Sequence, residues 1–344
     1  MTTDTNRRWL LASRPAGMAA ESNFVRRDEP RPPVADGQLL VRTLYLSVDP
    51  AMRGWMTEDP DYMPPIPLGS VMPAGGLGQV VESRHDDFQA GDFVSGLLGW
   101  QDYHRTDGRG TASLSTFEPV YPLPLYLGAL GGTGLTAYFG MREVARPKEG
   151  ETVVVSGAAG ATGSIAVQIG KILQCRVIGI AGGAAKCGWL TGELGLDAAI
   201  DYKAEDLDAR LTELCPGGVD VYFDNVGGPT LAALLDHMNR WGRVALCGMI
   251  SGYNASAPPS APANLFRLIT RRIRMEGFLV PDYAPRFKEA RRQLSAWLAT
   301  GALRSHEDVR EGFESIPATF LDLFRGGNTG KLMVKLADPP IRTA

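Results

Sequence analysis

The stretch "VVVSGAAGATGSIAVQIGK", residues 153–171, decides the fold. An apolar, β-branched run comes first and predicts a strand over residues 152–156. Gly157, Gly160 and Gly163 follow at intervals of three residues. Apolar residues then recur at 161, 165, 169 and 172, the spacing of a helix with one buried face. The stretch therefore predicts a strand, a glycine-rich turn and a helix in direct succession.

Strands and helices alternate through the chain after this stretch. Further strands are expected in "CRVIGIAG", "DAAIDY", "VDVYFDNVG", "GRVALCG" and "IRMEGFLV". Helical segments are expected in "KCGWLTGELG", "KAEDLDARLTELC" and "GPTLAALLDHMNR". Six strands alternating with helices are typical of a doubly wound parallel sheet, the Rossmann architecture of the α/β class.

The chain before this region is different in kind. It is rich in Pro and Gly, with short β-type runs such as "QLLVRTLYLSVDP" and "GDFVSGLLGW" between closely spaced turns. This pattern predicts a mostly β domain with barrel character. The tail "TGKLMVKLADPP" predicts one more strand, which is expected to return to that domain. We expect domains over 1–125, completed by 310–344, and over 126–309.

Composition excludes several classes of function. A net charge of −3 and a pI near 5.9 disfavour nucleic acid as a partner. We find no secretory pattern and no apolar run long enough to span a membrane, so the expected location is the cytoplasm. The four cysteines form no CxxC pair and the four histidines no HxxxH pair, so we expect no metal site.

The glycine-rich turn is a candidate phosphate site. A strand, a turn and a helix place unpaired backbone N–H groups and the positive end of the helix dipole at one point, which suits a pyrophosphate. The residues expected to bind it are Gly157, Gly160, Ala161, Thr162 and Gly163. Small residues let the phosphates approach the backbone, and Gly163 allows the helix to pack closely. The alternative is a tight turn with no ligand.

The second strand indicates which dinucleotide binds. NAD-type sites carry an acidic residue at the end of that strand, for the ribose 2′-hydroxyl. Here the strand ends "IAGGAAK", with Lys186 where a 2′-phosphate would attract a cation. Tyr202 could add a hydroxyl. The expected cofactor is NADPH, although Lys186 could also be an ordinary solvated lysine of a helix.

Seven motifs in order resemble one family. "SVDPAMRGWM", "GTGLTAYFGM", "SGAAGATGSIAVQIGK", "YFDNVGG", "CGMISGYN", "MEGFLV" and "GGNTGKLMVK" run from about residue 45 to residue 335. Together they are similar to the medium-chain dehydrogenase/reductases. The best match is the zinc-independent branch of prostaglandin/leukotriene reductases and alkenal double-bond reductases.

The resemblance implies a GroES-like, partly open β-barrel domain beside the Rossmann domain, and NADPH as cofactor. It implies that Gly160 to Gly163 hold the pyrophosphate and that Lys186 and Tyr202 meet the 2′-phosphate. Further residues implied around the ribose and nicotinamide are Asn225, Cys247, Gly248, Met249, Ile250, Ser251, Tyr253, Phe278, Leu279, Val280 and Asn328. The zinc enzymes of the family carry Cys and His ligands where this chain has "SVDPAMRG" and "PLGSVMPAGGLGQVV", with neither residue.

Without a metal to polarise a carbonyl, a conjugated alkene is a reasonable acceptor for a hydride. The enolate that forms needs hydrogen-bond donors and a proton. Tyr253 is the candidate catalytic residue, because its phenol lies on the loop implied to adjoin the nicotinamide. The alternative is an aromatic residue that only packs over the cofactor. The expected reaction is NADPH-dependent reduction of the C=C bond of α,β-unsaturated ketones or aldehydes.

The substrate side is less specific. Many reductases of this branch have Tyr where this chain has Ala51. Ala51, Met52, Trp55 and Tyr62 are expected at an apolar substrate rim, or else in the domain core, and Arg53 is expected to anchor its loop. Two alternatives stay open: a quinone oxidoreductase, and a catalytically weak NADPH-binding regulatory protein. The resemblance also implies a homodimer, formed through a sheet edge of the nucleotide domain.

Overall fold

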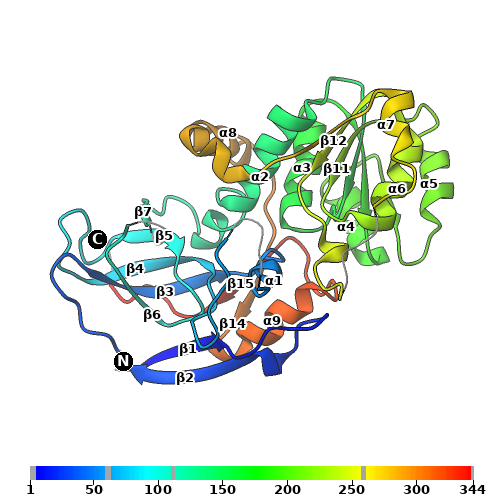
Figure 1. The fold of residues 1–344 in the computed structure, drawn as a ribbon. Helices are drawn as coiled ribbons and strands as arrows, with labels where there is room; N and C mark the ends of the chain where they lie inside the picture. The colour runs from blue at the N-terminus through cyan, green and yellow to red at the C-terminus, as the bar shows by residue number, and fades with distance from the viewer. Residues whose placement is uncertain (1–4, 59–62, 110–112, 257–260, 342–344) are drawn as a thin grey trace. The chain divides into compact units, whose positions relative to one another are not determined.

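The computed structural model describes residues 5–58, 63–109, 113–256 and 261–341. These residues form two compact units (Figure 1). The first unit takes the described residues of Met1–Leu127, Asp308–Asn328 and Leu332–Ala344. The second takes Gly128–Glu307 and Thr329–Lys331. The first unit is thus built from both the N-terminal and the C-terminal parts of the chain.

The second unit contains a six-stranded parallel sheet. Its strands are β8 (Thr152–Ser156), β9 (Arg176–Ala181), β10 (Ala198–Asp201), β11 (Val219–Asp224), β12 (Met238–Leu246) and β13 (Arg274–Gly277). They lie in the order β10-β9-β8-β11-β12-β13, and every pair of neighbours is parallel. This is the strand order of a doubly wound nucleotide-binding sheet and confirms the expected α/β class.

Helices cover both faces of this sheet (Figure 1). They are α3 (Ala161–Ile172), α4 (Ala184–Gly192), α5 (Leu207–Leu214), α6 (Gly228–His237) and α7 (Phe266–Arg271). Two more helices of this unit, α2 (Gly132–Phe139) and α8 (Phe287–Ala299), pack against each other, and α2 also packs against α3. Because both faces are covered, Val153, Val154 and Val155 of β8 are all fully buried. No helix within the described ranges is long and apolar enough to cross a membrane.

One boundary differs from the sequence expectation. The helical segment expected over 228–240 ends at His237, and β12 begins at Met238. Met238 is buried in the core, and the Asn239 side chain donates to Asp220 of the neighbouring strand (2.7 Å). Tertiary packing and one cross-strand hydrogen bond therefore override the local helical pattern of these residues.

The first unit is built on β-strands. They are β1 (Thr5–Leu11), β2 (Phe24–Pro30), β3 (Leu39–Ser47), β4 (Gly75–Ser83), β5 (Phe93–Leu97), β6 (Tyr103–Thr106), β7 (Ser115–Thr116), β14 (Glu307–Glu311) and β15 (Lys331–Lys335), with two short helices, α1 (Met52–Trp55) and α9 (Ile316–Leu323). β1 and β2 form a hairpin, and the other strands form a seven-stranded sheet. The expected tail strand is β15, which pairs antiparallel with β3.

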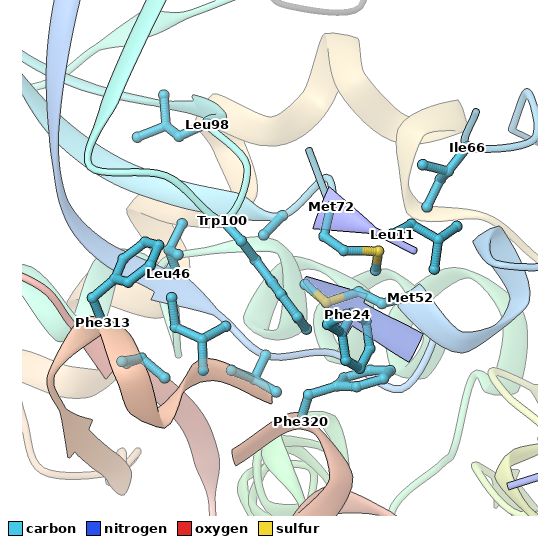
Figure 2. Close-up of a cluster of buried hydrophobic side chains, with 14 of the residues drawn as sticks. Leu11, Phe24, Leu46, Met52, Ile66, Met72, Leu98, Trp100, Phe313 and Phe320 are labelled. Atoms are coloured by element: carbon cyan, nitrogen blue, oxygen red, sulfur yellow. The ribbon is translucent and has the colours of Figure 1, made fainter. Parts of the chain in front are cut away.

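The core of the first unit gathers side chains from distant parts of the chain. Figure 2 shows Trp100 among Leu11, Phe24 and Leu46, with Phe313 and Phe320 from the C-terminal part. Met52 lies in the same cluster and is 0% exposed. In this structure Met52 is therefore a core side chain of the first unit, with no surface to offer a substrate.

Candidate functional site

The candidate site begins where β8 and β11 end. Strand order reverses between these two neighbours, since the chain continues outward from β8 to β9 and β10 and from β11 to β12 and β13. In open α/β sheets, ligands bind at the carboxyl ends of the strands at such a reversal. The segments that sequence analysis singled out, after 156, 181, 224 and 246, all follow carboxyl ends of strands of this sheet.

The phosphate loop has the geometry that its glycines predict. Gly157 has φ +57°, a left-handed conformation that glycine adopts without strain. A Cβ built on Gly163 would lie 2.2 Å from the carbonyl oxygen of Gly157, so only glycine lets α3 approach the turn. Gly160 is the N-cap of α3, and no side chain caps this helix start in the described part of the chain. Its first N–H groups are thus suited to an anion.

The turn after β9 forms the second part of the site. Gly182 and Gly183 follow the strand, and Gly183 has φ +102°. A Cβ on Gly182 would lie 2.9 Å from both the Tyr202 ring and the Lys203 side chain, so both cover this turn. Lys186 is half-buried in the first turn of α4. The structure therefore brings Lys186 and Tyr202 to one end of the sheet, and adds Lys203, which sequence analysis missed.

An acidic side chain also reaches this turn. Asp201, the last residue of β10, accepts hydrogen bonds from the backbone N–H groups of Gly183 (2.8 Å) and Lys203 (3.1 Å). No acid stands at the end of β9, as the sequence shows, but the next strand supplies one to the same turn. Both of these bonds join the Asp201 Oδ1 atom to backbone N–H groups, so this side chain fixes the shape of the turn. In the sequence, the only indication of this role was the position of Asp201 directly before Tyr202.

The turn after β11 is fixed by two glycines. Gly227 and Gly228 have φ values of +69° and +55°. A Cβ on Gly227 would lie 3.1 Å from the Met249 side chain, and one on Gly228 would lie 2.8 Å from Ser251 Oγ. The pair lets the 247–251 segment pack directly on the turn. Asn225 donates from Nδ2 to the carbonyl oxygen of Ser156 (2.7 Å), which ties the turn to β8.

The segment after β12 carries the candidate catalytic tyrosine. Tyr253 follows a short 3-10 helix, Ile250–Gly252, and its Oη accepts a hydrogen bond from the Met249 N–H (3.2 Å). The phenol oxygen thus lies over the backbone of Gly248 and Met249. Burial, and then the nearby Asp224 carboxyl, raise the pKa of the Cys247 thiol to about 12. Cys247 is therefore a neutral thiol at physiological pH and not a nucleophile.

The remaining cofactor candidates come from two other segments. Phe278 packs against Phe223 with ring centroids 6.3 Å apart, while Leu279 is exposed. In the second unit, the Gly330 N–H donates to the carbonyl oxygen of Ala159 (2.8 Å) in the phosphate loop. Asn328 precedes this contact by two residues in the chain and belongs to the first unit.

The expected substrate residues lie in the first unit. Ala51 and Trp55 are half-buried, and Trp55 packs against the core cluster. Tyr62 lies outside the described residues. Arg53 donates from Nη2 to the carbonyl oxygens of Pro15 (3.2 Å) and Gly17 (2.7 Å), as expected of a loop anchor.

A second arginine holds the same segment. Arg14 donates to the carbonyl oxygens of Met56, Thr57 and Ile66, each at 3.0 Å. These three bonds hold the chain just after α1, at Met56 and Thr57, and again at Ile66. The sequence gives no signal for this role of Arg14, because the acceptors are backbone atoms more than forty positions away in the chain.

Two further features bear on the choice of site. Among the described residues, no group of three or more His, Cys, Asp or Glu side chains is placed to hold a metal ion.

An open groove of about 650 Å³ lies at the amino edge of the same sheet, between residues 212–218, 236–240 and 267–271. Its Arg267 is paired with Asp236 (2.7 Å). The groove and the phosphate loop are at opposite edges of the sheet.

Comparisons with known proteins agree with this arrangement. Residues 7–114 match the family described as the N-terminal domain of oxidoreductase, and residues 161–298 match the family described as zinc-binding dehydrogenase. The chain is 42% identical to the NADPH-dependent curcumin reductase of Escherichia coli K12 over 337 residues, which covers 96% of this chain and 97% of that one.

Two more relatives cover nearly all of the chain. It is 39% identical over 338 residues to the 2-alkenal reductase (NADP(+)-dependent) of Nicotiana tabacum, covering 97% of this chain and 98% of that one. The crystal structure of CurA in complex with NADPH from Vibrio vulnificus superposes with a TM-score of 0.92 at 40% identity, covering 97% and 100% of the two chains. The chain therefore belongs to the medium-chain dehydrogenase/reductase family, in its branch of prostaglandin and alkenal double-bond reductases.

Proposed function

We propose that this protein is an NADPH-dependent reductase of the carbon–carbon double bond in α,β-unsaturated ketones and aldehydes. The observation that carries the proposal is the nucleotide site at the β8–β11 reversal, in a chain whose relatives over 95% or more of its length are named as NADP(H)-dependent reductases of this kind. The CurA structure, with which this chain shares fold and 40% identity, holds NADPH.

The cofactor residues are assigned as follows. Gly157, Gly160, Ala161, Thr162 and Gly163 bind the pyrophosphate, with the N–H groups of the first turn of α3 as the donors. Lys186 and Tyr202 bind the 2′-phosphate, and the absence of an acid at the end of β9 supports NADPH over NADH. The ribose and nicotinamide side takes Asn225, Cys247, Gly248, Met249, Ile250, Ser251, Tyr253, Phe278, Leu279, Val280 and Asn328.

The bound NADPH supplies a hydride. The hydride forms the new C–H bond at the β-carbon, and the π electrons of the C=C bond pass to the carbonyl as an enolate. A proton from solvent then adds to the α-carbon, so the alkene is reduced and the carbonyl is kept. Tyr253 stabilises the enolate oxygen as a hydrogen-bond donor, which is the role of a preorganised donor where charge develops. Its Oη accepts from the Met249 N–H (3.2 Å), which orients the phenol.

The chemistry needs no metal ion in this proposal, since a conjugated alkene accepts hydride once its carbonyl oxygen is hydrogen-bonded. Ala51 and Trp55 are proposed to contact substrate. Ala51 leaves more room for a bulky substrate than the tyrosine that many members of the branch have at this position. Met52 is left out of this set because its side chain is buried in the core of the first unit.

A panel of matched substrates tests the proposal. NADPH oxidation is measured with an enone, an alkenal, their saturated counterparts and a benzoquinone. Turnover of the enone and alkenal, with none of the saturated ketone and aldehyde, is expected. Turnover of the quinone alone would make the protein a quinone oxidoreductase. Tight NADPH binding with no turnover of any compound would favour a regulatory protein.

A homodimer in the cytoplasm is part of the proposal. β13 is one of the two edge strands of the parallel sheet. Trp241 on the neighbouring strand β12, and Phe266 and Ile269 on α7, which packs on β12, are 66%, 69% and 70% exposed. Exposed apolar groups next to an open strand edge suit a second copy of the chain. All four cysteines are free thiols, as fits a reducing compartment. Sedimentation equilibrium and cell fractionation test these two points.

A further inference from the structure

A buried carboxyl group lies under the candidate cofactor site and has no part in the chemistry above. Asp224, the last residue of β11, is 0% exposed. Its Oδ1 accepts four hydrogen bonds, from Ser156 Oγ (2.9 Å), Tyr222 Oη (2.6 Å) and the backbone N–H groups of Val226 and Gly227 (both 2.9 Å). One oxygen atom thus organises a strand end, a buried phenol and a turn.

The other oxygen of the same group, Oδ2, is buried without a hydrogen-bond partner among the described residues. No Lys or Arg of the described chain forms an ion pair with Asp224. The compensation comes from the four donors and from the N-terminus of α6, which begins at Gly228. A buried carboxyl with one unused oxygen is costly, so its four bonds on the other oxygen indicate a specific task.

Asp224 bridges the place where the strand order reverses. Ser156 ends β8 and Asp224 ends β11, and these strands are neighbours in the sheet. Asn225 strengthens the bridge: its N–H donates to Ser156 Oγ (3.0 Å) and its Nδ2 to the Ser156 carbonyl oxygen (2.7 Å). The start of the phosphate loop and the turn after β11 are therefore one hydrogen-bonded unit.

The turn after β11 is also hydrogen-bonded to the segment that leads to the candidate tyrosine, Tyr253. The N–H groups of Cys247 (2.8 Å) and Gly248 (3.1 Å) donate to the Asp224 carbonyl oxygen. Ser251 donates to the Val226 carbonyl oxygen, from its N–H (3.1 Å) and its Oγ (2.6 Å). The conformation of residues 247–251 thus depends on the turn that Asp224 fixes.

We propose that Asp224 is the positioning residue for the nicotinamide half of the cofactor site. It acts through the 225–228 turn and the 247–251 segment and touches neither cofactor nor substrate. The adenosine half, at the ends of β9 and β10, does not depend on it, because the Gly183 turn is held by Asp201 instead (2.8 Å). The inference rests on the proposed use of NADPH and concerns binding, so it does not require turnover of any substrate.

The same strand provides a matched control. Asp220, near the amino end of β11, accepts from the Thr152 N–H (2.9 Å) and from Asn239 Nδ2 (2.7 Å). It therefore ties β11 to β8 and β12 at the amino edge of the sheet, whereas the Asp224 carboxyl ties β11 to β8 at the carboxyl edge. A purely structural role predicts similar consequences for removing either carboxyl, whereas a positioning role predicts a difference.

The test measures dissociation constants of NADPH and of 2′,5′-ADP, which lacks the nicotinamide half, for the wild type, Asp224→Ala, Asp224→Asn and Asp220→Ala. We expect Asp224→Ala to weaken NADPH about thirtyfold, since several buried hydrogen bonds lose their acceptor, and to weaken 2′,5′-ADP less than about threefold. Asp224→Asn keeps an acceptor oxygen for the four donors and should recover most of the NADPH affinity. Asp220→Ala should lower the unfolding midpoint and change neither constant.

Equal weakening of both ligands by Asp224→Ala, or the same selective loss in Asp220→Ala, would overturn the proposal. If Asp224→Ala does not fold, Ser156→Ala provides the second variant, because it removes one donor to Oδ1 and one acceptor for Asn225. It should weaken NADPH selectively by about fivefold, and an unselective loss would again overturn the proposal. A wild type that binds NADPH but reduces no enone would refute the proposed function and leave this inference standing.

Discussion

The two edges of the six-stranded sheet are built for different tasks. At the amino edge, carboxylates are paired with cations and backbone N–H groups: Glu151 with Arg243, and Asp197 with Lys171 (2.8 Å) and the Val177 N–H (2.7 Å). At the carboxyl edge, glycines with positive φ form open turns, and the one buried carboxyl, Asp224, has no cationic partner in the described chain. The first edge stabilises the unit, and the second has the start of α3, where no side chain caps the helix in the described chain, as a place for an anion.

This contrast explains why the groove at the amino edge is a weaker candidate for the cofactor than the carboxyl edge. The groove is lined by groups that already satisfy one another, as Arg267 and Asp236 do. The carboxyl edge combines the uncapped start of α3 with the turns at Gly183 and Gly227. Substitutions at the carboxyl edge should accordingly change cofactor affinity or turnover, and substitutions at the amino edge should change the free energy of unfolding.

The largest effect is expected at Gly163. Gly163→Ala places a Cβ 2.2 Å from the Gly157 carbonyl oxygen, so the phosphate loop must move. We expect NADPH affinity to fall about a hundredfold, because such overpacking costs about 3 kcal/mol. Titration of NADPH fluorescence measures it. The control is Gly188→Ala in α4, where a Cβ would meet nothing within 4 Å. Equal affinity in the two variants would contradict the assignment of the loop.

Lys186 tests the discrimination between cofactors. Lys186→Ala should raise the KM for NADPH about fiftyfold and leave the KM for NADH within about twofold, since only NADPH carries the 2′-phosphate. The matched control is Lys171→Ala at the amino edge of the same sheet, where Lys171 pairs with Asp197. An equal loss for both cofactors would show that Lys186 acts on the fold and not on the phosphate.

Tyr253 separates chemistry from binding. Tyr253→Phe removes the phenol donor and keeps the ring, so kcat for an enone should fall about twentyfold while the dissociation constant of NADPH stays within about twofold. Stopped-flow single turnovers measure the hydride step directly. A kcat equal to that of the wild type would leave Tyr253 as a packing residue.

The smallest effect is expected at the amino edge. Burial raises the pKa of Glu151, but the hydrogen bonds from Arg243 and from the Lys148 N–H outweigh it and lower this pKa below its ordinary 4.5. This contribution to stability is present above pH 4.5 and is lost as the pH falls through the folded-state pKa. Glu151→Gln should cost about 1 kcal/mol of unfolding free energy at neutral pH.

Urea unfolding of both proteins at neutral pH and at about pH 3.5 checks the sign of this effect. The difference between wild type and Glu151→Gln should narrow at the lower pH, and NADPH affinity at neutral pH should be unchanged. A difference that widens on acidification, or a loss of cofactor affinity, would remove the distinction between the two edges.

Much of the fold could be predicted, because buried parallel strands are nearly continuous apolar runs and the turns between them carry glycine. The strand at Thr152–Ser156 is an example, and β15 was expected from the tail. The boundary at His237 could not be predicted, since the helical pattern continues past it and only the packing of Met238 ends the helix.

The site was harder to predict where it depends on contacts between strands. The glycines and Lys186 follow a local pattern, whereas Asp201 reaches the Gly183 turn from a different strand, eighteen positions away. Met52 was expected either at a substrate rim or in the domain core, because a short helix gives no periodicity to tell the two apart, and it lies in the core. Asp224 stands in a quoted motif, but its four bonds on one oxygen are visible only in three dimensions.

The most direct measurement follows the hydride itself. The enzyme is given an enone and NADPH deuterated at the transferable C4 position, and the product is examined by NMR. We expect one deuterium on the β-carbon, a proton from solvent on the α-carbon and an intact carbonyl group. Deuterium on the carbinol carbon, or a product without deuterium, would contradict the assignment of this protein as a double-bond reductase.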